Sequence, residues 1–168
     1  MSYRSRLFTY GTLTFQEVMI HLLGREIPYE KAKINGYSAF VVKGQNFPAL
    51  RKTTSSSSTN GIMYSNLETE DWKILDQFED YFYNRVVEEI VLEDGTHQKA
   101  FTYVVSPKFY YLLDSNVWDS KKFQNNSLNS FLDTISPFSM KSDSAKDIAS
   151  AKKIEKKDAK IRIIKITL

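Results

Sequence analysis

Glu79 is the residue of this sequence best placed to move a proton. Trp72, Leu75 and Glu79 stand at i, i+3 and i+7, so they share one face of a predicted helix. That spacing puts a carboxylate on the face that Trp72 and Leu75 would bury, near the C-terminal end of the helix. Burial and the helix dipole both favour the neutral form of a carboxyl group there, as a general base acting near neutral pH requires. The alternative is an ordinary acid at a helix end, either solvated or paired with Arg85.

The segment from Tyr10 to Phe15 is the second candidate for chemistry, because it predicts a loop at the start of a helix. Backbone amides at a helix N-terminus commonly receive a carboxylate or a phosphate, and Gly11 would let the backbone approach such a ligand closely. The loop matches neither a Walker A sequence nor a dinucleotide-binding fingerprint. Taken alone, an ordinary turn between a strand and a helix is the simpler interpretation.

Other polar residues give weaker signals. Tyr83, Arg85 and Tyr103 could line a polar pocket, although half-buried sheet aromatics and a salt-bridging arginine would explain them too. His21 and His97 have no partner at metal-ligand spacing, and the chain has no Cys, so we expect neither a metal site nor a thiolate nucleophile. No combination of Ser, His and Asp suggests a nucleophilic triad.

The candidate loop is expected to lie between a strand and a helix. Residues 6–10 are short, aromatic and β-favouring. Thr14 and Glu17 have the spacing of a capping box, apolar residues follow at helical spacing, and Gly24 is expected to end the helix. The sequence therefore predicts a strand–loop–helix unit with the candidate loop at its centre.

The rest of the chain reads as short strands with few helices. Hydrophobic patterns and turn signals predict a strand over 34–42 kinked at Gly36, an extended segment over 47–50, an exposed loop over 51–60 and a strand over 61–64. A helix is expected from an N-cap at Thr69, and a terminal helix over 118–135. Between these two helices we expect a hairpin of strands 85–92 and 97–105 around Asp94-Gly95. Because the strands do not alternate regularly with long helices, we expect an α+β fold with a curved or barrel-like sheet rather than a doubly wound parallel sheet.

Length and composition support a single folded domain. The chain has 168 residues, of which 42% are hydrophobic, and 11 Phe with 10 Tyr supply much of the area that a core needs. We place the domain at residues 1–136 and a basic tail, flexible or forming an added strand, at residues 137–168. No apolar run approaches the ~20 residues of a membrane helix, and the start shows no signal-peptide core, so we expect a cytoplasmic protein without a membrane partner.

Positive charge is concentrated at the C-terminal end. Residues 139–168 hold nine Lys or Arg and four Asp or Glu, a net of +5, which leaves −2 for the remainder of a chain of net charge +3. Such a tail could contact nucleic acid, but it lacks interleaved aromatic residues, so a solvated charged tail is the simpler interpretation. We therefore expect no nucleic-acid partner and rank an interaction module that acts through the tail last among the possible functions.

Several motifs together give the sequence a family resemblance. In chain order they are Leu7-Phe8-Thr9-Tyr10-Gly11-Thr12-Leu13, Gly36-Tyr37, Phe47-Pro48-Ala49, Gly61-Ile62-Met63-Tyr64, Leu75-Asp76-Gln77-Phe78-Glu79-Asp80, Tyr83-Asn84-Arg85 and Ala100-Phe101-Thr102-Tyr103. In order and spacing they resemble the gamma-glutamylcyclotransferase-like superfamily, most closely its small branch of gamma-glutamylamine cyclotransferases and plant avirulence-induced proteins. The first motif matches the family's YGTL-type opening, and the acidic motif matches its LD-x-(F/Y)-E pattern followed by Y-x-R. The likeness covers roughly residues 6–135.

The resemblance implies a small mixed, partly closed β-barrel flanked by helices, with a cavity where the opening loop meets the acidic helix. It implies that Glu79 is the catalytic acid/base and that the loop binds the glutamyl moiety of a small-molecule γ-glutamyl substrate, without a metal or organic cofactor. The expected substrate-binding residues are Tyr10, Gly11, Thr12 and Leu13 from the motif, Thr14 and Phe15 by adjacency, and Pro48, Tyr83 and Arg85 from the expected pocket.

The reaction that the resemblance implies is cyclisation of the γ-glutamyl group to 5-oxoproline with release of an amine. Glu79 would take a proton from the α-ammonium group and deliver it to the departing nitrogen. The competing interpretation is a non-catalytic small-molecule-binding or stress-response protein that keeps the cavity. The identity of the amine and the oligomeric state stay open. The walls that select the amine are expected from Phe47-Pro48-Ala49, Tyr81, Phe82 and the Ser-rich loop.

Overall fold

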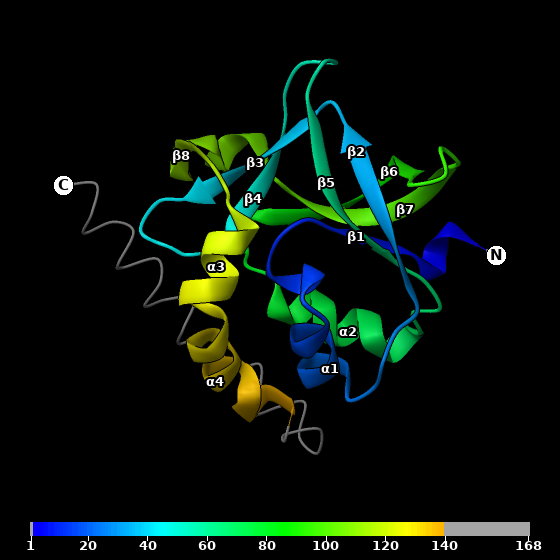
Figure 1. Ribbon diagram of the computed structural model, residues 1–168, viewed down its shortest axis with the longest axis vertical. Helices are drawn as coiled ribbons and strands as arrows, with labels where there is room; N and C mark the ends of the chain where they lie inside the picture. The colour runs from blue at the N-terminus through cyan, green and yellow to red at the C-terminus, as the bar shows by residue number, and fades with distance from the viewer. Residues whose placement is uncertain (1, 140–168) are drawn as a thin grey trace.

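A closed five-stranded β-barrel forms the centre of the protein in the computed structural model, which describes residues 2–139 (Figure 1). In spatial order its strands are β1 (Leu7–Thr9), β5 (Ser58–Tyr64), β2 (Tyr29–Asn35), β6 (Tyr83–Leu92) and β7 (His97–Val105). β1 pairs antiparallel with β5 and parallel with β7, where Leu7 faces Phe101, and these two pairings close the barrel. The expected α+β fold with a mixed barrel is confirmed.

A second, three-stranded sheet stands beside the barrel, with β3 (Tyr37–Val42) between β4 (Pro48–Lys52) and β8 (Leu113–Val117). The single strand predicted over 34–42 is therefore wrong, because it is divided between β2 of the barrel and β3 of the small sheet. Gly36 stands between them with φ 79°, in the left-handed region that glycine adopts most readily. One residue thus redirects the chain from one sheet to the other.

The link between β4 and β5 is shorter than predicted. The exposed loop expected over 51–60 is wrong at both ends, since β4 continues to Lys52 and β5 begins at Ser58. Gly36 closes this corner, because its N–H donates to the Ser57 carbonyl and its carbonyl accepts from the Thr53 N–H, both at 2.8 Å. In contrast, the predicted hairpin of β6 and β7 is confirmed, with Gly95 at φ 85° in its turn.

Helices cover one side of the barrel (Figure 1). They are α1 (Gln16–Leu23), α2 (Thr69–Phe78), α3 (Ser120–Asn126) and α4 (Leu128–Ser139), with short 3₁₀ turns η1 (Tyr3–Ser5), η2 (Thr12–Thr14) and η3 (Pro107–Leu112). α1 contacts both α2 and α4. The single terminal helix predicted over 118–135 is instead two helices that meet at Ser127, whose backbone leaves the helical region at φ −134° and ψ −19°.

The start of α1 differs from the prediction. The capping box expected from Thr14 and Glu17 is not formed, because the Thr14 hydroxyl donates to the Gly11 carbonyl at 2.6 Å instead. That bond belongs to η2, and Phe15 precedes the first residue of α1 without a side-chain cap. The predicted helix stop at Gly24 is confirmed by its left-handed backbone at φ 71°.

The start of α2 is displaced by one residue from the predicted N-cap at Thr69. Glu68 is the N-cap, and its side chain accepts from the Asp71 backbone while the Asp71 carboxylate accepts from the Glu68 N–H at 2.8 Å. A carboxylate accepts two or more hydrogen bonds at a helix N-terminus and is also favoured there by the helix dipole. The carboxylates of Glu68 and Asp71, and not the hydroxyl of Thr69, therefore accept the hydrogen bonds of the first backbone N–H groups of α2.

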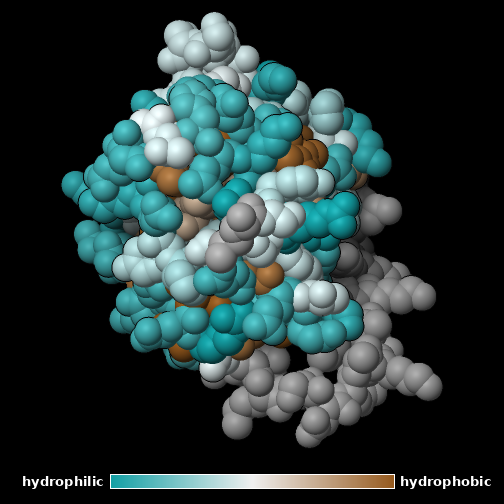
Figure 2. Space-filling view, turned by 90° about the vertical axis from the view of Figure 1, so that its right-hand side faces the viewer, coloured by the Kyte–Doolittle hydropathy of each residue, from teal (hydrophilic) through white to brown (hydrophobic). Residues whose placement is uncertain are grey.

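The core consists of two main clusters, since alternate residues of a strand point to opposite faces. One cluster, which includes Phe8, gathers buried side chains from every barrel strand and from β3 and β4. The other, which includes Leu7, lies between the barrel and the helices and contains Val18, Met19 and Leu75. Figure 2 shows that the face seen there is largely hydrophilic, with apolar residues in small separate groups.

Gly61 sets how closely β5 approaches β1, the strand that leads into the candidate loop. A Cβ atom at Gly61 would lie 2.0 Å from the Thr9 carbonyl oxygen and 2.8 Å from the Phe8 ring. Only a residue without a side chain allows the two strands to pair at this distance.

No helix in the described part of the chain is long and apolar enough to span a membrane. The tail predicted at 137–168 lies outside the described residues from position 140 onward, while α4 continues through Ser139. The domain boundary at residue 136 stays a prediction.

Candidate active site

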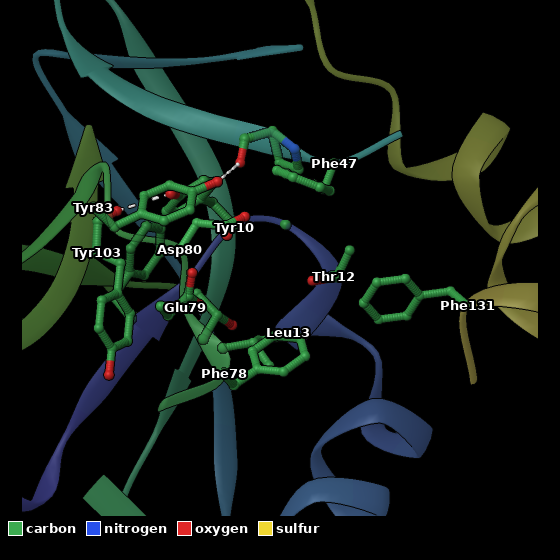
Figure 3. A pocket seen from close by; sticks show the side chains of 14 residues that line it. Tyr10, Thr12, Leu13, Phe47, Phe78, Glu79, Asp80, Tyr83, Tyr103 and Phe131 are labelled. Carbon is green, nitrogen blue, oxygen red and sulfur yellow. Dashed lines mark hydrogen bonds between the residues drawn. The ribbon is translucent and has the colours of Figure 1, made fainter. Parts of the chain in front are cut away.

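A cavity of about 170 Å³ lies where the segment after β1 meets the segment after α2 (Figure 3). Its wall is built by Phe8, Thr9, Tyr10, Gly11, Thr12, Leu13, Phe47, Pro48, Phe78, Glu79, Asp80, Tyr83, Tyr103 and Phe131. The two candidate segments, more than sixty residues apart in the sequence, thus line one cavity.

Glu79 reaches the cavity from just beyond the end of α2. It is the C-cap residue, with an extended backbone at φ −72° and ψ 145°, and its N–H donates to the Leu75 carbonyl at 3.1 Å. The prediction that Glu79 shares a helical face with Trp72 and Leu75 is therefore wrong, since the helical repeat ends at Phe78. The chain turns toward the barrel at this point, and the turn carries the carboxylate of Glu79 to the cavity wall.

The loop between β1 and α1 supplies four adjoining residues of the wall, Tyr10 to Leu13. A Cβ atom at Gly11 would lie 2.7 Å from Cγ of Pro48, so the glycine lets the loop press against the first residue of β4. The loop then forms the 3₁₀ turn η2, closed by the Thr14 N–H donating to the Gly11 carbonyl at 3.0 Å. The first amides of a helical turn have no partner within the turn, and here they belong to residues that line the cavity.

Two tyrosines, the buried Tyr10 of the loop and the partly buried Tyr83 of β6, hold parts of the wall in place. The Tyr10 hydroxyl donates to the Tyr103 carbonyl at 2.8 Å and accepts from the Leu50 N–H at 3.2 Å. The Tyr83 hydroxyl donates to the Pro48 carbonyl at 2.6 Å, as Figure 3 shows. The Tyr10 hydroxyl thus joins the loop to β7 and β4, and the Tyr83 hydroxyl joins β6 to β4, which fixes both rings.

The electrostatics of these tyrosines also indicate where Glu79 lies. Burial raises the pKa of Tyr10 well above its usual value, and the negative charge of Glu79 raises it further. Burial, and after it the charges of Tyr10 and Glu79, raise the pKa of Tyr83 in the same direction. The pKa of Tyr103 is raised by burial, by its hydrogen bond to Asp76 and by Glu79. All three phenols therefore stay protonated near neutral pH, and Glu79 lies within electrostatic reach of each.

Tyr103 is connected to a charged group behind the wall. Its hydroxyl donates to Oδ1 of Asp76 at 2.6 Å, and Oδ2 of Asp76 accepts from Arg85 at 3.1 Å. The Arg85 guanidinium also stacks on two rings, with its carbon 4.5 Å from the Trp72 ring centroid and 4.7 Å from that of Phe101. Arg85 is thereby held beside the wall of the cavity and supports Tyr103 through Asp76.

The structure gathers most of the predicted site residues and leaves three outside. Thr14 faces a separate polar groove, Phe15 packs against Phe123 at a centroid distance of 5.4 Å, and Arg85 pairs with Asp76. The residues that line the cavity are Glu79, Tyr10, Gly11, Thr12, Leu13, Pro48 and Tyr83. Their roles toward a substrate stay predictions.

The predicted amine-selecting walls are placed differently from the expectation. Phe47 lines the cavity, whereas Ala49 is fully buried and Tyr81 and Phe82 pack in another cluster with Phe109. The Ser-rich loop borders the separate polar groove through Ser57 and Ser58.

Five lining residues had no place in the predicted site, namely Phe8, Thr9, Phe78, Asp80 and Phe131. Asp80 follows Glu79 directly and could have been found from its position in the acidic motif. Phe131 comes from α4, and its helical spacing indicated only a core contact, because no local pattern tells which helix reaches a cavity in another part of the chain. Among residues 2–139, no group of three or more His, Cys, Asp or Glu side chains could hold a metal ion.

Known proteins share both the sequence pattern and the fold. AIG2-like protein C of Arabidopsis thaliana is 32% identical over 99 residues, which cover 58% of this chain and 57% of that protein. The match thus spans less than two thirds of that relative's length. AIG2-like protein D of the same plant is 26% identical over 132 residues, covering 75% of this chain and 83% of that protein.

A solved structure named gamma-glutamyl cyclotransferase has the same fold, with a TM-score of 0.54 at 12% identity over 78% of this chain and 85% of the other. Residues 7–120 match the sequence profile of the family described as "Gamma-glutamyl cyclotransferase, AIG2-like". These residues include the loop, the acidic segment and every barrel strand, and on that evidence the chain belongs to the gamma-glutamyl cyclotransferase, AIG2-like family.

Proposed function

We propose that the protein is a γ-glutamyl cyclotransferase that converts a γ-glutamyl amine or amino acid into 5-oxoproline and the free amine. The observation that carries the proposal is that Glu79 and the backbone of the Tyr10–Leu13 loop line one small cavity. Membership of the family supports the same reaction class.

The loop would hold the α-carboxylate of the substrate. The amides of Gly11, Thr12 and Leu13 lie at the start of the η2 turn, where N–H groups lack partners within the turn and favour an anion. Gly11 lets this turn lie against Pro48, another residue of the cavity wall. A carboxylate bound there would fix one end of the glutamyl group and leave the other to reach Glu79.

Glu79 would then act first as a base and later as an acid. Its carboxylate takes a proton from the α-ammonium group, and the free amine attacks the γ-carbonyl carbon to form the C–N bond of the five-membered ring. The attacking nitrogen gives up a second proton as the ring forms. Glu79 returns the first proton to the departing nitrogen as the original amide bond breaks, and the released amine takes up the second as it becomes an ammonium ion, so no net proton is gained or lost. Because both reacting groups belong to one molecule, positioning supplies much of the rate.

Tyr10 and Tyr83 do not compete with Glu79 for the proton. The hydroxyls of Tyr10 and Tyr83 already donate to carbonyl groups, and the pKa of each is raised by burial. Glu79 and Asp80 are the carboxyl groups on the described wall. The assignment of the base therefore reduces to a choice between two neighbouring acids.

A substrate panel with matched variants tests the proposal. Purified protein would be incubated with γ-glutamyl amino acids, a γ-glutamyl-ε-lysine isopeptide and small γ-glutamyl amines, and 5-oxoproline would be measured. We expect turnover of at least one compound, and a loss of roughly 10²–10⁴-fold in kcat for Glu79→Gln. Glu70→Gln, which changes an exposed acid in the first turn of α2, should leave kcat unchanged.

Two outcomes would contradict this assignment. If Asp80→Asn abolished turnover while Glu79→Gln retained it, the base would be Asp80 and not Glu79. If no γ-glutamyl compound gave 5-oxoproline, the non-catalytic binding protein would be the better description.

A further inference from the structure

The hydroxyl group of Tyr64 contacts the candidate loop from outside the cavity. It donates to the Leu13 carbonyl at 2.8 Å and accepts from Nε2 of Gln16, the first residue of α1, at 3.0 Å. Tyr64 lies on β5, 51 residues along the chain from Leu13, and is not part of the cavity wall. One phenol thus connects the barrel, the end of the loop and the helix that follows the loop.

The barrel fixes the ring of Tyr64. The side chain is fully buried in the core cluster between the barrel and the helices, where close packing leaves it little freedom. Its backbone is paired on both sides, with Leu7 of β1 and with Tyr29 of β2. Burial also raises the pKa of the phenol above its usual value, so the hydroxyl keeps its proton near neutral pH and donates it to the Leu13 carbonyl.

The carbonyl groups of the loop accept hydrogen bonds from two kinds of donor. The Gly11 carbonyl accepts from the Thr14 N–H at 3.0 Å and from the Thr14 hydroxyl at 2.6 Å. The Thr12 carbonyl accepts from the Phe15 N–H at 3.3 Å. These donors follow their acceptors by three residues and form with the turn itself. The Leu13 carbonyl instead accepts from the phenol on β5, so the barrel sets its direction.

The direction of this carbonyl also sets the direction of the amides. The N–H and C=O groups of a helical turn point in opposite directions along its axis. In the function proposed above, the amides of Gly11, Thr12 and Leu13 receive the α-carboxylate of the substrate. Because the Leu13 carbonyl is held toward the core, the amide end of the turn is directed toward the cavity that these residues line. Without the phenol, the turn would keep its local bonds but lose the bond that orients it against the barrel.

Tyr64 differs in one respect from Tyr10, which holds the other end of the loop. The Tyr10 side chain is part of the cavity wall, so its substitution changes the surface that a ligand meets. Tyr64 does not line the cavity, so its hydroxyl can be removed while the lining residues stay the same.

We propose that Tyr64 is a positioning residue for the α-carboxylate of the substrate, because its bond to the Leu13 carbonyl keeps the amides of the loop directed at that group. The inference rests on the cyclotransferase function proposed above and deepens it by naming a residue outside the cavity on which carboxylate binding depends. A general stabilising role would affect all ligands alike, whereas this role affects those that carry the carboxylate.

Two ligands that differ only by that carboxylate test the inference. Glutaric acid monomethylamide carries the group, N-methylbutyramide does not, and neither has the amine needed to cyclise. NMR titration of the full chain measures both dissociation constants. In the wild type we expect the glutaric compound to bind at least about tenfold more tightly, because its carboxylate accepts charge-assisted hydrogen bonds from the amides. Tyr64→Phe keeps the ring and should reduce this advantage about tenfold, while the binding of N-methylbutyramide stays nearly unchanged.

The same comparison is made in turnover. γ-Glutamyl methylamide would cyclise to 5-oxoproline, and 4-aminobutyryl methylamide, which lacks the carboxylate, would cyclise to 2-pyrrolidinone. Tyr64→Phe should raise KM for γ-glutamyl methylamide about tenfold and lower the ratio of the two kcat/KM values by the same factor. A variant that merely contained less folded protein would lower both values equally and leave their ratio unchanged.

Two variants serve as controls. Tyr37→Phe removes the hydroxyl of another buried tyrosine, which donates to Glu88 at 2.6 Å and does not line the cavity. Gln16→Met removes the other partner of Tyr64 and leaves the bond to Leu13 in place. Both variants should keep the wild-type ratios. An equal loss in Gln16→Met would overturn the inference, since the start of α1 and not the bond to Leu13 would then orient the loop.

The outcomes separate this inference from the function on which it rests. A wild type that binds both ligands equally, or a Tyr64→Phe variant that weakens both equally, would overturn the role of Tyr64 while 5-oxoproline formation still supported the cyclotransferase. A selective loss without 5-oxoproline from any γ-glutamyl compound would support the positioning role and overturn the catalytic proposal. No binding of either ligand together with no 5-oxoproline would overturn both.

Discussion

Replacing Gly11 by Ala tests whether the loop depends on its contact with Pro48. The added methyl group would lie 2.7 Å from Cγ and 3.0 Å from Cδ of Pro48, well inside the contact distance of roughly 3.5–4.0 Å between carbon atoms. Pro48 cannot easily retreat, because the next two residues of β4, Ala49 and Leu50, are both fully buried. The loop must therefore move away from β4, and the cavity wall moves with it.

The size of the effect follows from overpacking. Forcing an extra carbon into a packed site costs about 1–3 kcal/mol in the free energy of unfolding. A displacement of about 1 Å in a substrate-positioning group can cost on the order of 10²-fold in rate. We expect Gly11→Ala to lose stability in this range and to lose more activity than stability. Urea unfolding with linear extrapolation measures the first effect, and 5-oxoproline formation measures the second.

A double-mutant cycle distinguishes the clash from other effects of the methyl group. Pro48→Ala removes the ring carbons that the new methyl group would meet but keeps the carbonyl that accepts from Tyr83. Gly11→Ala should therefore cost less in the Pro48→Ala background, with a coupling energy of about 1 kcal/mol or more. If Gly11→Ala cost the same in both backgrounds, the contact with Pro48 would not be the reason for the glycine.

Three further outcomes are expected. Gly61→Ala should destabilise by about 3 kcal/mol or more, read from urea unfolding, because its Cβ would lie 2.0 Å from a carbonyl oxygen of β1. Tyr103→Phe removes one hydrogen bond to Asp76 and should cost only about 0.5–1.5 kcal/mol in the same assay. Burial raises the pKa of Tyr10 and Tyr83 in the folded state alone. Their contribution to stability should therefore be constant below about pH 10 and fall as the pH rises further, because only the unfolded phenols ionise there. Unfolding curves at increasing pH measure this dependence of the free energy of unfolding on pH. A free energy of unfolding that rose above pH ~10 would contradict the raised pKa of the two tyrosines in the folded state.

Elements that depend on neighbouring residues were predictable from the sequence. The hairpin of β6 and β7 was found because Asp94 and Gly95 carry its turn chemistry, with the Asp94 carboxylate accepting from the Thr96 N–H at 2.8 Å. The end of α1 was found because Gly24 is an ordinary helix stop. In both cases the physical cause lies within a few residues of the feature.

Elements that depend on distant contacts were not predictable in the same way. The alternation of apolar residues over 34–42 cannot show that Gly36 sends the chain into another sheet, since both sheets impose the same period of two. The boundary between α3 and α4 at Ser127 could not be predicted either, because Phe123 and Phe131 keep helical spacing across it.

The site shows the same division. Glu79 lies at the cavity as expected, but through the chain turn after α2 and not through the helical face that the spacing indicated. Its place at the cavity was predicted from the resemblance of the whole acidic motif to the family pattern, whose spacing includes this turn. Phe131 escaped prediction, because only the packing of α4 against Phe78 and Phe123 brings it to the cavity.

Two close backbone contacts explain why separate motifs belong to one site. Gly61 of β5 approaches the Thr9 carbonyl, and two residues later Gly11 meets the ring of Pro48 in β4. The segment between Thr9 and Gly11 is thus held from one sheet by β5 and from the other by β4. Tyr83 ties the same Pro48 to β6, the strand that follows the Glu79 turn. The loop and the segment that carries Glu79 are therefore coupled through Pro48, which is the geometric condition that the proposed proton transfer by Glu79 requires.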